Sequence, residues 1–484
     1  MKKINILLIG LGYHARRIYA PHFTRDNINA NLAAILDLES QKEIIEKYLA
    51  DKQIKSQTYY IDNTQISDKL IKKELEVLTY IIKQHNIQAV IISTEPLAHY
   101  KYASWAISNN LHVLLDKPIT TEIDVSIDES KANKLFDDYK KLEKLYLSKK
   151  EEIVFTLMAQ RRFHEGFIKA KEKIEEMVLI SGCPVTSIQS FHSDGQWRFP
   201  KEIVEQIAHP YNQGYGKMSH SGYHTLDTCI WFASTSRSIQ KKWNNYELYS
   251  QFIRPSDVMS QFNVADYRRL FPNIPDDYLV SSLQMKNHFK VYGEIDAYST
   301  ISLKRNSNIL THISCGALHN GFGQRSWITA KGRDLYKGNG RIRHESYIIE
   351  QGPFQAICIN SFQSQEILKE QIPSYDFGGE YHFDIHLFRN STLFPNEKPY
   401  ELLTMDSLRC PTDLNYSRGH QEEARYNCID EFLHSITRKT CISNQKSNFL
   451  QHRLTTQLLS SIYCSASRQF KGETGVISQV IDNV

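Results

Sequence analysis

A lysine and a carboxylate stand together where an apolar run of the chain stops. The apolar run 113–115 is followed by Asp116, Lys117 and Pro118. Pro118 lacks a backbone donor and disfavours helical geometry at Lys117, so we expect a strand to end here. In open α/β sheets, ligands bind at the carboxyl ends of the strands. The pattern therefore puts an ammonium group, which can steady a developing oxyanion, at an edge suited to a ligand.

Two histidines and an aspartate offer a second kind of chemistry. His220 and His224 are spaced so that one face of a helix would carry both imidazoles, a spacing that also serves zinc, and Asp227 could be a third ligand. No glutamate follows His220, however, and Gly222 weakens a helix between the two histidines. We therefore predict no bound metal ion and keep a metallohydrolase only as an alternative.

The N-terminal stretch predicts a site for a dinucleotide. Residues 4–9 form a largely apolar run, typical of a strand buried on both faces, and a helix is expected from about residue 14 to 23. Between them, a G-x-G-x-x-A turn can bring the backbone close to a pyrophosphate at a helix N-terminus. The residues expected to bind the cofactor here are Gly10, Gly12, Tyr13, His14 and Ala15.

An aspartate ends the second expected strand, residues 31–36. Asp37 can accept hydrogen bonds from both ribose hydroxyls of NAD, and its charge would repel the 2′-phosphate of NADP. Residues 38–41 supply no arginine for that phosphate. NAD is therefore favoured over NADP, although an acid at a helix N-terminus would explain Asp37 as well.

Strand and helix patterns alternate up to about residue 158, which predicts a doubly wound parallel sheet, the Rossmann architecture. A helix and a run of β-branched and aromatic strands follow, which predicts an α+β second domain with an open, mostly antiparallel sheet. We expect the domains to span residues 1–160 and 161–484. Insertions are expected near 235–295 and 370–420, and terminal helices within 425–470.

Three stretches resemble one known family. Residues 10–17, residues 93–120 and G-Y-G-K-M-S-H-S-G-Y-H-T-L-D at 214–227 are similar to the glucose–fructose oxidoreductase and inositol dehydrogenase family, also called Gfo/Idh/MocA. Asp116 stands where the family's E-K-P tripeptide has glutamate. His220 replaces the aspartate of the third motif, and Tyr215 replaces its middle glycine.

The resemblance implies roles for particular side chains. It implies that His224 is the general acid/base, that Lys117 polarises the same substrate oxygen, and that His220 belongs to the catalytic group. The residues implied to touch the cofactor are Thr94, Pro96, His99 and Lys117. Those implied to line the substrate site are Arg162, Trp197, Arg198, His220 and Asp227. The implied reaction is hydride transfer between nicotinamide and a hydroxyl or ketone of a sugar, cyclitol or sugar derivative.

Composition narrows the class of protein further. The chain has 484 residues, a formal charge of only +4 and no basic block interleaved with aromatics, so no nucleic-acid partner is expected. No apolar run is long enough to span a membrane. Eight scattered cysteines favour reduced thiols in the cytoplasm. The resemblance implies a homo-oligomer, a dimer or tetramer.

Two other functions stay open at this point. The replacement at His220 is compatible with a catalytically idle or regulatory dinucleotide-binding protein. The same family also includes NAD-dependent glycosidases, which cleave a glycoside through transient oxidation. The substrate itself is beyond what the sequence specifies.

Overall fold

The computed structural model describes residues 3–25, 27–62, 69–206, 210–235, 241–279, 288–323, 341–364, 372–408, 419–438 and 442–481. The chain divides into two compact units. Unit 1 comprises Met1–Thr121, Phe136–Phe163 and Gln421–Thr456; unit 2 comprises Glu122–Leu135, His164–His420 and Gln457–Val484. Compact units need not coincide with domains, so the predicted boundary at residue 160 stays a prediction. Each unit is described by itself.

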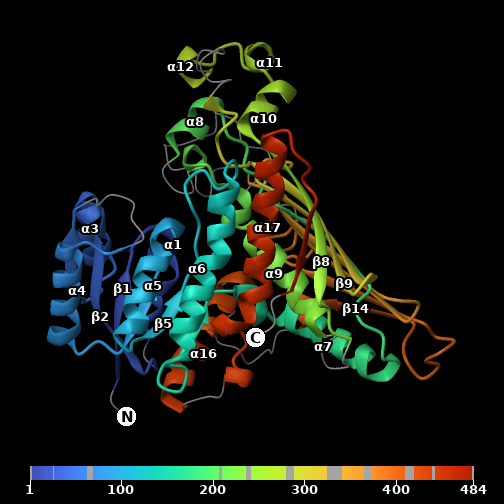
Figure 1. Cartoon of the computed structure of the whole chain (residues 1–484), viewed down its shortest axis with the longest axis horizontal. Helices are drawn as coiled ribbons and strands as arrows, with labels where there is room; N and C mark the ends of the chain where they lie inside the picture. The colour runs from blue at the N-terminus through green and yellow to red at the C-terminus, as the bar shows by residue number, and fades with distance from the viewer. Residues whose placement is uncertain are drawn as a thin grey trace. The chain divides into compact units, whose positions relative to one another are not determined.

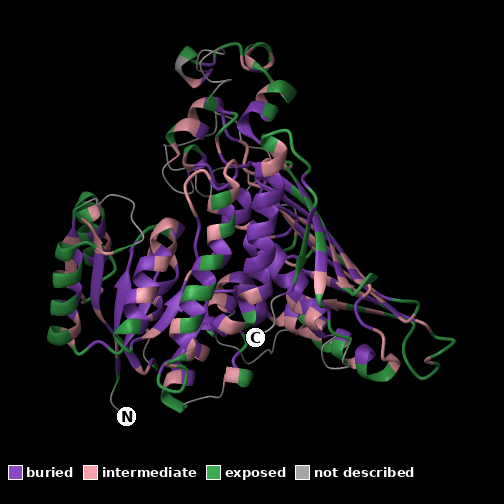
Figure 2. Cartoon of the chain, in the orientation of Figure 1, coloured by how far each residue is buried: buried purple, intermediate pink, exposed green. Residues whose placement is uncertain are grey.

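Unit 1 is built on a six-stranded parallel sheet in the order β3-β2-β1-β4-β5-β6, which confirms the predicted doubly wound Rossmann architecture. Its central strands are buried (purple in Figure 2), whereas the outer faces of α3 and α4 are exposed. The strands are β1 (Ile4–Ile9), β2 (Ala30–Leu38), β3 (Gln57–Ile61), β4 (Ala89–Ile92), β5 (His112–Leu115) and β6 (Phe155–Leu157) (Figure 1).

The expected helix over residues 14–23 is interrupted. It forms two short helices, α1 (Tyr13–Arg17) and α2 (Tyr19–His22), with Ile18 between them. Pro21 explains the break, because its ring displaces the carbonyl four residues earlier and it has no N–H to donate. The other helices and 3-10 turns that lie wholly or partly in unit 1 are η1 (Glu39–Gln41), α3 (Lys42–Asp51), α4 (Lys72–His85), η2 (Pro96–Ala98), α5 (His99–Ser108), α6 (Glu129–Leu147) and η3 (Gln160–Phe163).

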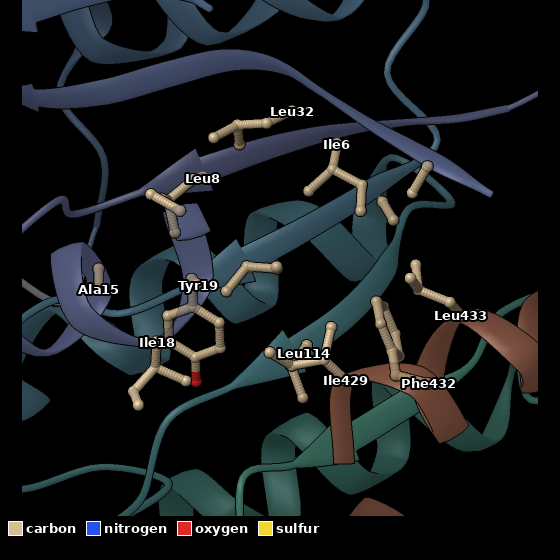
Figure 3. Packing of buried hydrophobic residues seen from close by; sticks show 14 of the residues in the cluster. Ile6, Leu8, Ala15, Ile18, Tyr19, Leu32, Leu114, Ile429, Phe432 and Leu433 are labelled. Atoms are coloured by element: carbon tan, nitrogen blue, oxygen red, sulfur yellow. The ribbon is translucent and has the colours of Figure 1, made fainter. Parts of the chain in front are cut away.

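A helix from the far end of the chain completes the core of unit 1. Side chains of α16 (His420–Arg438) join one apolar cluster with β1, β2, β4 and β5 and with α1, α2 and α3. Figure 3 shows Ile429, Phe432 and Leu433 of α16 together with Leu114 of β5 in this cluster. Residues Gln421–Arg438 of this helix thus belong to compact unit 1, and the predicted assignment of the helix to the second domain stays a prediction.

The C-terminal segment after α16 also covers the edge of the unit 1 sheet. The Leu157 N–H donates to the Ser447 carbonyl (3.0 Å), and Thr156 forms a bridge with Asn448. Pairing of this kind protects the exposed backbone groups of an edge strand. The turns of this segment are η7 (Ile442–Asn444) and η8 (Phe449–His452).

Unit 2 is built on a nine-stranded sheet in the order β14-β13-β12-β11-β7-β10-β9-β8-β15. All neighbours are antiparallel except β7 and β10, which confirms the predicted open, mostly antiparallel sheet. The strands are β7 (Ser187–Ser193), β8 (Asn245–Ile253), β9 (Asp296–Arg305), β10 (Asn308–Leu318), β11 (Arg343–Gln351), β12 (Gln355–Gln363), β13 (Asp384–Arg389), β14 (Tyr400–Thr404) and β15 (Ile477–Val480).

Helices pack on one face of this sheet. They include α7, which contacts β13; α9, which contacts β7 and β10; and α17, which bonds to β8 through Ser465 and Ser250 (2.9 Å). The helices and 3-10 turns are α7 (Glu165–Ser181), α8 (Pro200–Glu205), η4 (Tyr211–Gln213), η5 (Lys217–Ser219), α9 (Gly222–Ala233), α10 (Pro255–Gln261), α11 (Val264–Leu270), α12 (Asp276–Leu279), α15 (Met405–Leu408) and α17 (Arg453–Phe470).

None of the helices in the described ranges is long and apolar enough to cross a membrane. Six of the eight cysteines lie in those ranges; Cys410 and Cys441 lie outside them.

Candidate functional site

The glycine turn after β1 has the geometry that its sequence predicted. Gly10 has a φ of +88°, and a Cβ at this position would lie 2.5 Å from the Ser93 carbonyl oxygen, so only glycine fits. A Cβ on Gly12 would meet nothing within 4 Å, so the backbone is open on that side. Ala15 is fully buried against the sheet. These features fit the close approach of a dinucleotide pyrophosphate.

Asp37 fixes the glycine turn from the end of β2. Its carboxylate accepts the Leu11 N–H (2.5 Å) and the Leu38 N–H (2.7 Å). Burial raises the pKa of Asp37, while these two hydrogen bonds and the nearby Arg16 oppose the shift. Each carboxylate oxygen keeps a lone pair that a ribose hydroxyl could use. Asp37 lies in the strand rather than in the first turn of the following helix.

His99 joins the ends of β4 and β5. Its Nδ1 lies 2.7 Å from the Pro118 carbonyl oxygen, and its Nε2 lies 3.1 Å from the Thr94 carbonyl oxygen. Burial lowers the pKa of His99, while the contacts with the Pro118 and Thr94 carbonyls oppose the shift. Thr94 and Pro96 thus lie in a loop held beside the Lys117 segment. Cofactor contact by these residues stays a prediction.

Asp116 is held by two side chains that sequence analysis did not single out. The Tyr19 hydroxyl donates to one carboxylate oxygen, and Ser93 Oγ donates to the other at 2.6 Å. The Asp116 N–H also bonds to the Ile92 carbonyl (3.0 Å). Lys117, the next residue, is half-buried. Its position at the carboxyl end of β5 is the one its sequence predicted.

In unit 2, the stretch 214–227 does not form one helix. Lys217–Ser219 is a 3-10 turn, His220 has non-helical dihedrals, and α9 begins only at Gly222. The premise of the zinc alternative is therefore wrong, because His220 and His224 do not share a helical face. No group of three or more histidine, cysteine or acidic side chains suited to a metal occurs in the described part of the chain.

The predicted histidines are buried in unit 2. The His220 ring lies edge-on to Tyr215 (centroids 5.5 Å apart) and stacks with His319 (5.8 Å). His224 lies in the first turn of α9, and Asp227 lies one turn further along; both are buried. Their predicted roles stay predictions.

A buried lysine that sequence analysis missed lies in the same stretch. Lys217 Nζ donates to Asp194 Oδ2 (2.7 Å) and to His192 Nδ1 (2.9 Å), and the ammonium side chain is completely buried. An ammonium group only donates, so Nδ1 of His192 is the acceptor in this contact. Lys217 lies inside the 214–227 motif, and this position is the feature of the sequence that could have identified it as a site residue.

Asp194 gathers further donors. Ser221 Oγ donates to Oδ2 (2.6 Å), and Arg341 donates to Oδ1 and, through Nε, to the backbone carbonyl (2.9 Å). Burial by itself would raise the pKa of Asp194, but Lys217 and Arg341 hold it well below the usual range. Asp194 is therefore an ionised carboxylate shared by two cations.

A polar chain connects Arg198 with this network. The Tyr211 hydroxyl lies 2.6 Å from His319 Nδ1, and His319 Nε2 lies 3.7 Å from Asp194 Oδ2. Arg198 hydrogen-bonds to Gln196 (2.6 Å) and interacts with Tyr211, whose pKa is raised by burial. Arg198, His220 and the Lys217–Asp194 pair are thus brought together, through His319 and Tyr211.

Two residues that were predicted to line the substrate site contact other parts of the protein. Arg162 is buried in unit 1, where it donates to the Lys446 carbonyl (3.2 Å) and to the Gln451 side chain (2.9 Å). Trp197 packs in unit 2 in an aromatic cluster supplied largely by the short helices of the insertion. Substrate contact by either residue stays a prediction.

The chain resembles known proteins in sequence and fold. The model of the family GFO_IDH_MocA, an oxidoreductase family with an NAD-binding Rossmann fold, matches residues 4–147. An uncharacterized oxidoreductase of Schizosaccharomyces pombe is 29% identical over 206 residues, which are 42% of this chain and 49% of that protein. The match thus spans about half the length of this curated relative.

Solved structures share the fold at low sequence identity. Levoglucosan dehydrogenase in complex with NADH and levoglucosan has a TM-score of 0.58 at 12% identity, covering 99% of this chain and 100% of that one. An NAD-binding oxidoreductase from Klebsiella pneumoniae has a TM-score of 0.57 at 11% identity, with complete coverage of both chains. The scyllo-inositol dehydrogenase of Lactobacillus casei has a TM-score of 0.54 at 13% identity, covering 99% and 98%.

Proposed function

We propose that this chain, whose residues 4–147 match the model of the GFO_IDH_MocA oxidoreductase family, is an NAD-dependent dehydrogenase or reductase of a sugar, cyclitol or sugar derivative. The observation that carries the proposal is the set of strand ends in unit 1. There the open glycine turn, the Asp37 carboxylate and Lys117 follow strands of one parallel sheet.

NAD, when bound, supplies the hydride acceptor or donor of the reaction. Gly10, Gly12 and Ala15 would let the backbone approach its pyrophosphate, with Tyr13 and His14 beside them in the turn. Asp37 would accept the ribose hydroxyls and disfavour a 2′-phosphate, so the proposal is NAD rather than NADP.

Oxidation of a secondary alcohol needs a base for the hydroxyl proton and a positive group near the developing oxyanion. We assign the positive group to Lys117 and the base to His224. His220 and Arg198 would form hydrogen bonds with hydroxyl groups of the substrate. Two of the structural neighbours, a levoglucosan dehydrogenase and a scyllo-inositol dehydrogenase, support a sugar-like or cyclitol substrate class.

The test is nicotinamide absorbance with NAD⁺ or NADH and a panel of sugars, polyols and their ketones. Lys117→Ala and His224→Ala should each lower kcat by about 10²–10³-fold, because each removes a group that acts on the reacting oxygen, while the Kd for NADH changes little. Lys73→Ala is the control, since Lys73 forms an exposed ion pair with Asp62 in unit 1.

Two outcomes would contradict the proposal. Failure of either nucleotide to bind at millimolar concentration would remove its basis. Binding of NADH without turnover of any panel member would favour the regulatory alternative.

A homo-oligomer is part of the same proposal. The face of the unit 2 sheet away from its helices carries exposed aromatic and aliphatic side chains: Tyr249, Tyr298, Ile348, Phe388, Tyr400 and Leu402. A second copy of the chain would cover such a face. Light scattering of the purified protein should give the mass of a dimer or tetramer, and a monomeric mass at micromolar concentration would contradict this.

A further inference from the structure

Three segments of unit 1 meet at the Asp116 carboxylate. Tyr19 reaches it from α2, Ser93 reaches it from the end of β4, and Asp116 itself ends β5. Hydrogen bonds to a carboxylate are stronger than those between neutral groups and impose a tighter geometry. Asp116 is thus held through its side chain by residues well separated from it in the sequence.

Tyr19 is anchored on the opposite side by the core. Its ring is fully buried in the apolar cluster that α16 completes, and Figure 3 shows it beside Ile18, with its hydroxyl at the end away from Leu8. Burial, and then the charge of Asp116, raise the pKa of Tyr19 well above its usual value. The hydroxyl therefore keeps its proton and acts as a donor to Asp116.

The backbone on both sides of Lys117 is fixed as well. The Asp116 N–H bonds to Ile92, and the Pro118 carbonyl lies against the His99 ring. These contacts join β5 to β4 and its loop. Tyr19 differs from them because it connects the same segment to a third element, α2, and through it to the core.

The acid at this position is short, and its two donors reach it from other elements. Aspartate is one methylene shorter than the glutamate that stands at this place in the family's tripeptide. Its carboxylate therefore stays closer to the backbone of β5, and a donor must come to it. The Tyr19 hydroxyl occupies that place.

We propose that Tyr19 is a positioning residue that, through Asp116, holds Lys117 in the geometry needed for the proposed reaction. The inference rests on the proposed function for its kinetic consequence. Its structural consequence, the restraint of Lys117, is independent of any substrate.

The kinetic test compares two buried tyrosines of unit 1. Tyr19→Phe should lower kcat about tenfold, because small displacements of a reacting group have large effects on rate, while the Kd for NADH stays within about twofold. Tyr146→Phe is the matched control. Tyr146 is equally buried, but its hydroxyl accepts from Asn448 (2.9 Å) instead of bonding to Asp116.

A double-mutant cycle separates positioning from general destabilisation. If Tyr19 acts only through Asp116, the losses in kcat of Tyr19→Phe and Asp116→Asn should be less than additive in the double variant, because both changes disrupt the same hydrogen bond. Losses that simply add in the double variant would overturn the proposal.

A second measurement needs no substrate. Reductive methylation followed by mass spectrometry gives the labelling rate of Lys117. That rate should rise about threefold or more in Tyr19→Phe, since a loosened segment opens more often, and should not change in Tyr146→Phe. Equal labelling in both variants overturns the inference even if the chain proves inactive. An inactive parent chain with faster labelling in Tyr19→Phe would instead count against the proposed function alone.

Discussion

The strand ends of unit 1 and the polar network of unit 2 are held in place in different ways. Around Lys117, the restraints are hydrogen bonds to backbone carbonyls and to one carboxylate, beside an apolar core. Around Lys217, the restraints are charges: one carboxylate, Asp194, is shared by Lys217 and Arg341 with almost no exposure to water. Removal of one charge should therefore lower the stability of unit 2 far more than loss of one apolar contact lowers the stability of unit 1.

The largest effect is expected from Lys217→Met. The change leaves a buried carboxylate short of one of its two cations, and breaking a buried pair typically costs about 4 kcal/mol of stability. Urea unfolding followed by tryptophan fluorescence measures the loss. The exposed pair of Lys73 and Asp62 provides the control, since Lys73→Met should produce no measurable change.

The double variant Lys217→Met/Asp194→Leu sharpens this comparison. It removes the buried ammonium group together with the buried carboxylate and leaves only Arg341, whose side chain is partly exposed, so it should be more stable than Lys217→Met alone. If Lys217→Met proved as harmless as Lys73→Met, the ionic account of unit 2 would be wrong.

A pH effect of intermediate size is expected from Glu294, another buried acid of unit 2. Burial raises its pKa to about 7, although Met218 N–H (2.8 Å) and the Tyr463 hydroxyl (2.9 Å) both donate to it. A raised carboxyl pKa stabilises the fold below the unfolded value of 4.5, and this contribution is lost as the pH rises through 7. The loss amounts to about 3 kcal/mol.

Glu294→Gln provides the matched control, because the amide keeps an acceptor oxygen but does not titrate. Unfolding free energies of the two proteins between pH 5 and pH 8 should diverge as the parent loses stability. Asp194 acts with the opposite sign, since its lowered pKa stabilises the fold above the usual aspartate range and is lost in acid. Parallel pH profiles of parent and variant would contradict the Glu294 assignment.

The smallest effect is expected in the apolar core of unit 1. Ile429→Val removes one methyl group from the contact of α16 with the sheet and should cost about 1 kcal/mol. Ile44→Val is the control, because Ile44 is about half exposed on α3. Equal unfolding free energies for the two variants would mean that α16 does not belong to this core.

Local spacing explains what the sequence could predict. Gly10 and Lys117 follow an apolar strand within a few residues and Asp37 lies in the last residues of one, so their place at the strand ends follows from the parallel sheet. Even here, Pro21 interrupted a helix that was expected to run on.

The features that the sequence did not predict depend on contacts between residues far apart in the chain. Asp194 and Arg341 form an ion pair although they are 147 positions apart in the sequence, so no local pattern predicts the pair. His220 and His224 have helical spacing, yet the chain turns at His220 before α9 begins, so spacing alone was misleading. The joining of α16 to the N-terminal sheet depends on tertiary packing of an amphipathic helix that could have covered either unit.

Binding of the dinucleotide is the central claim, and fluorescence titration of the intact chain with NADH tests it most directly. We predict saturable binding in the micromolar range, weaker binding of NADPH, and loss of that preference in Asp37→Ala. Absence of NADH binding at millimolar concentration would contradict the account.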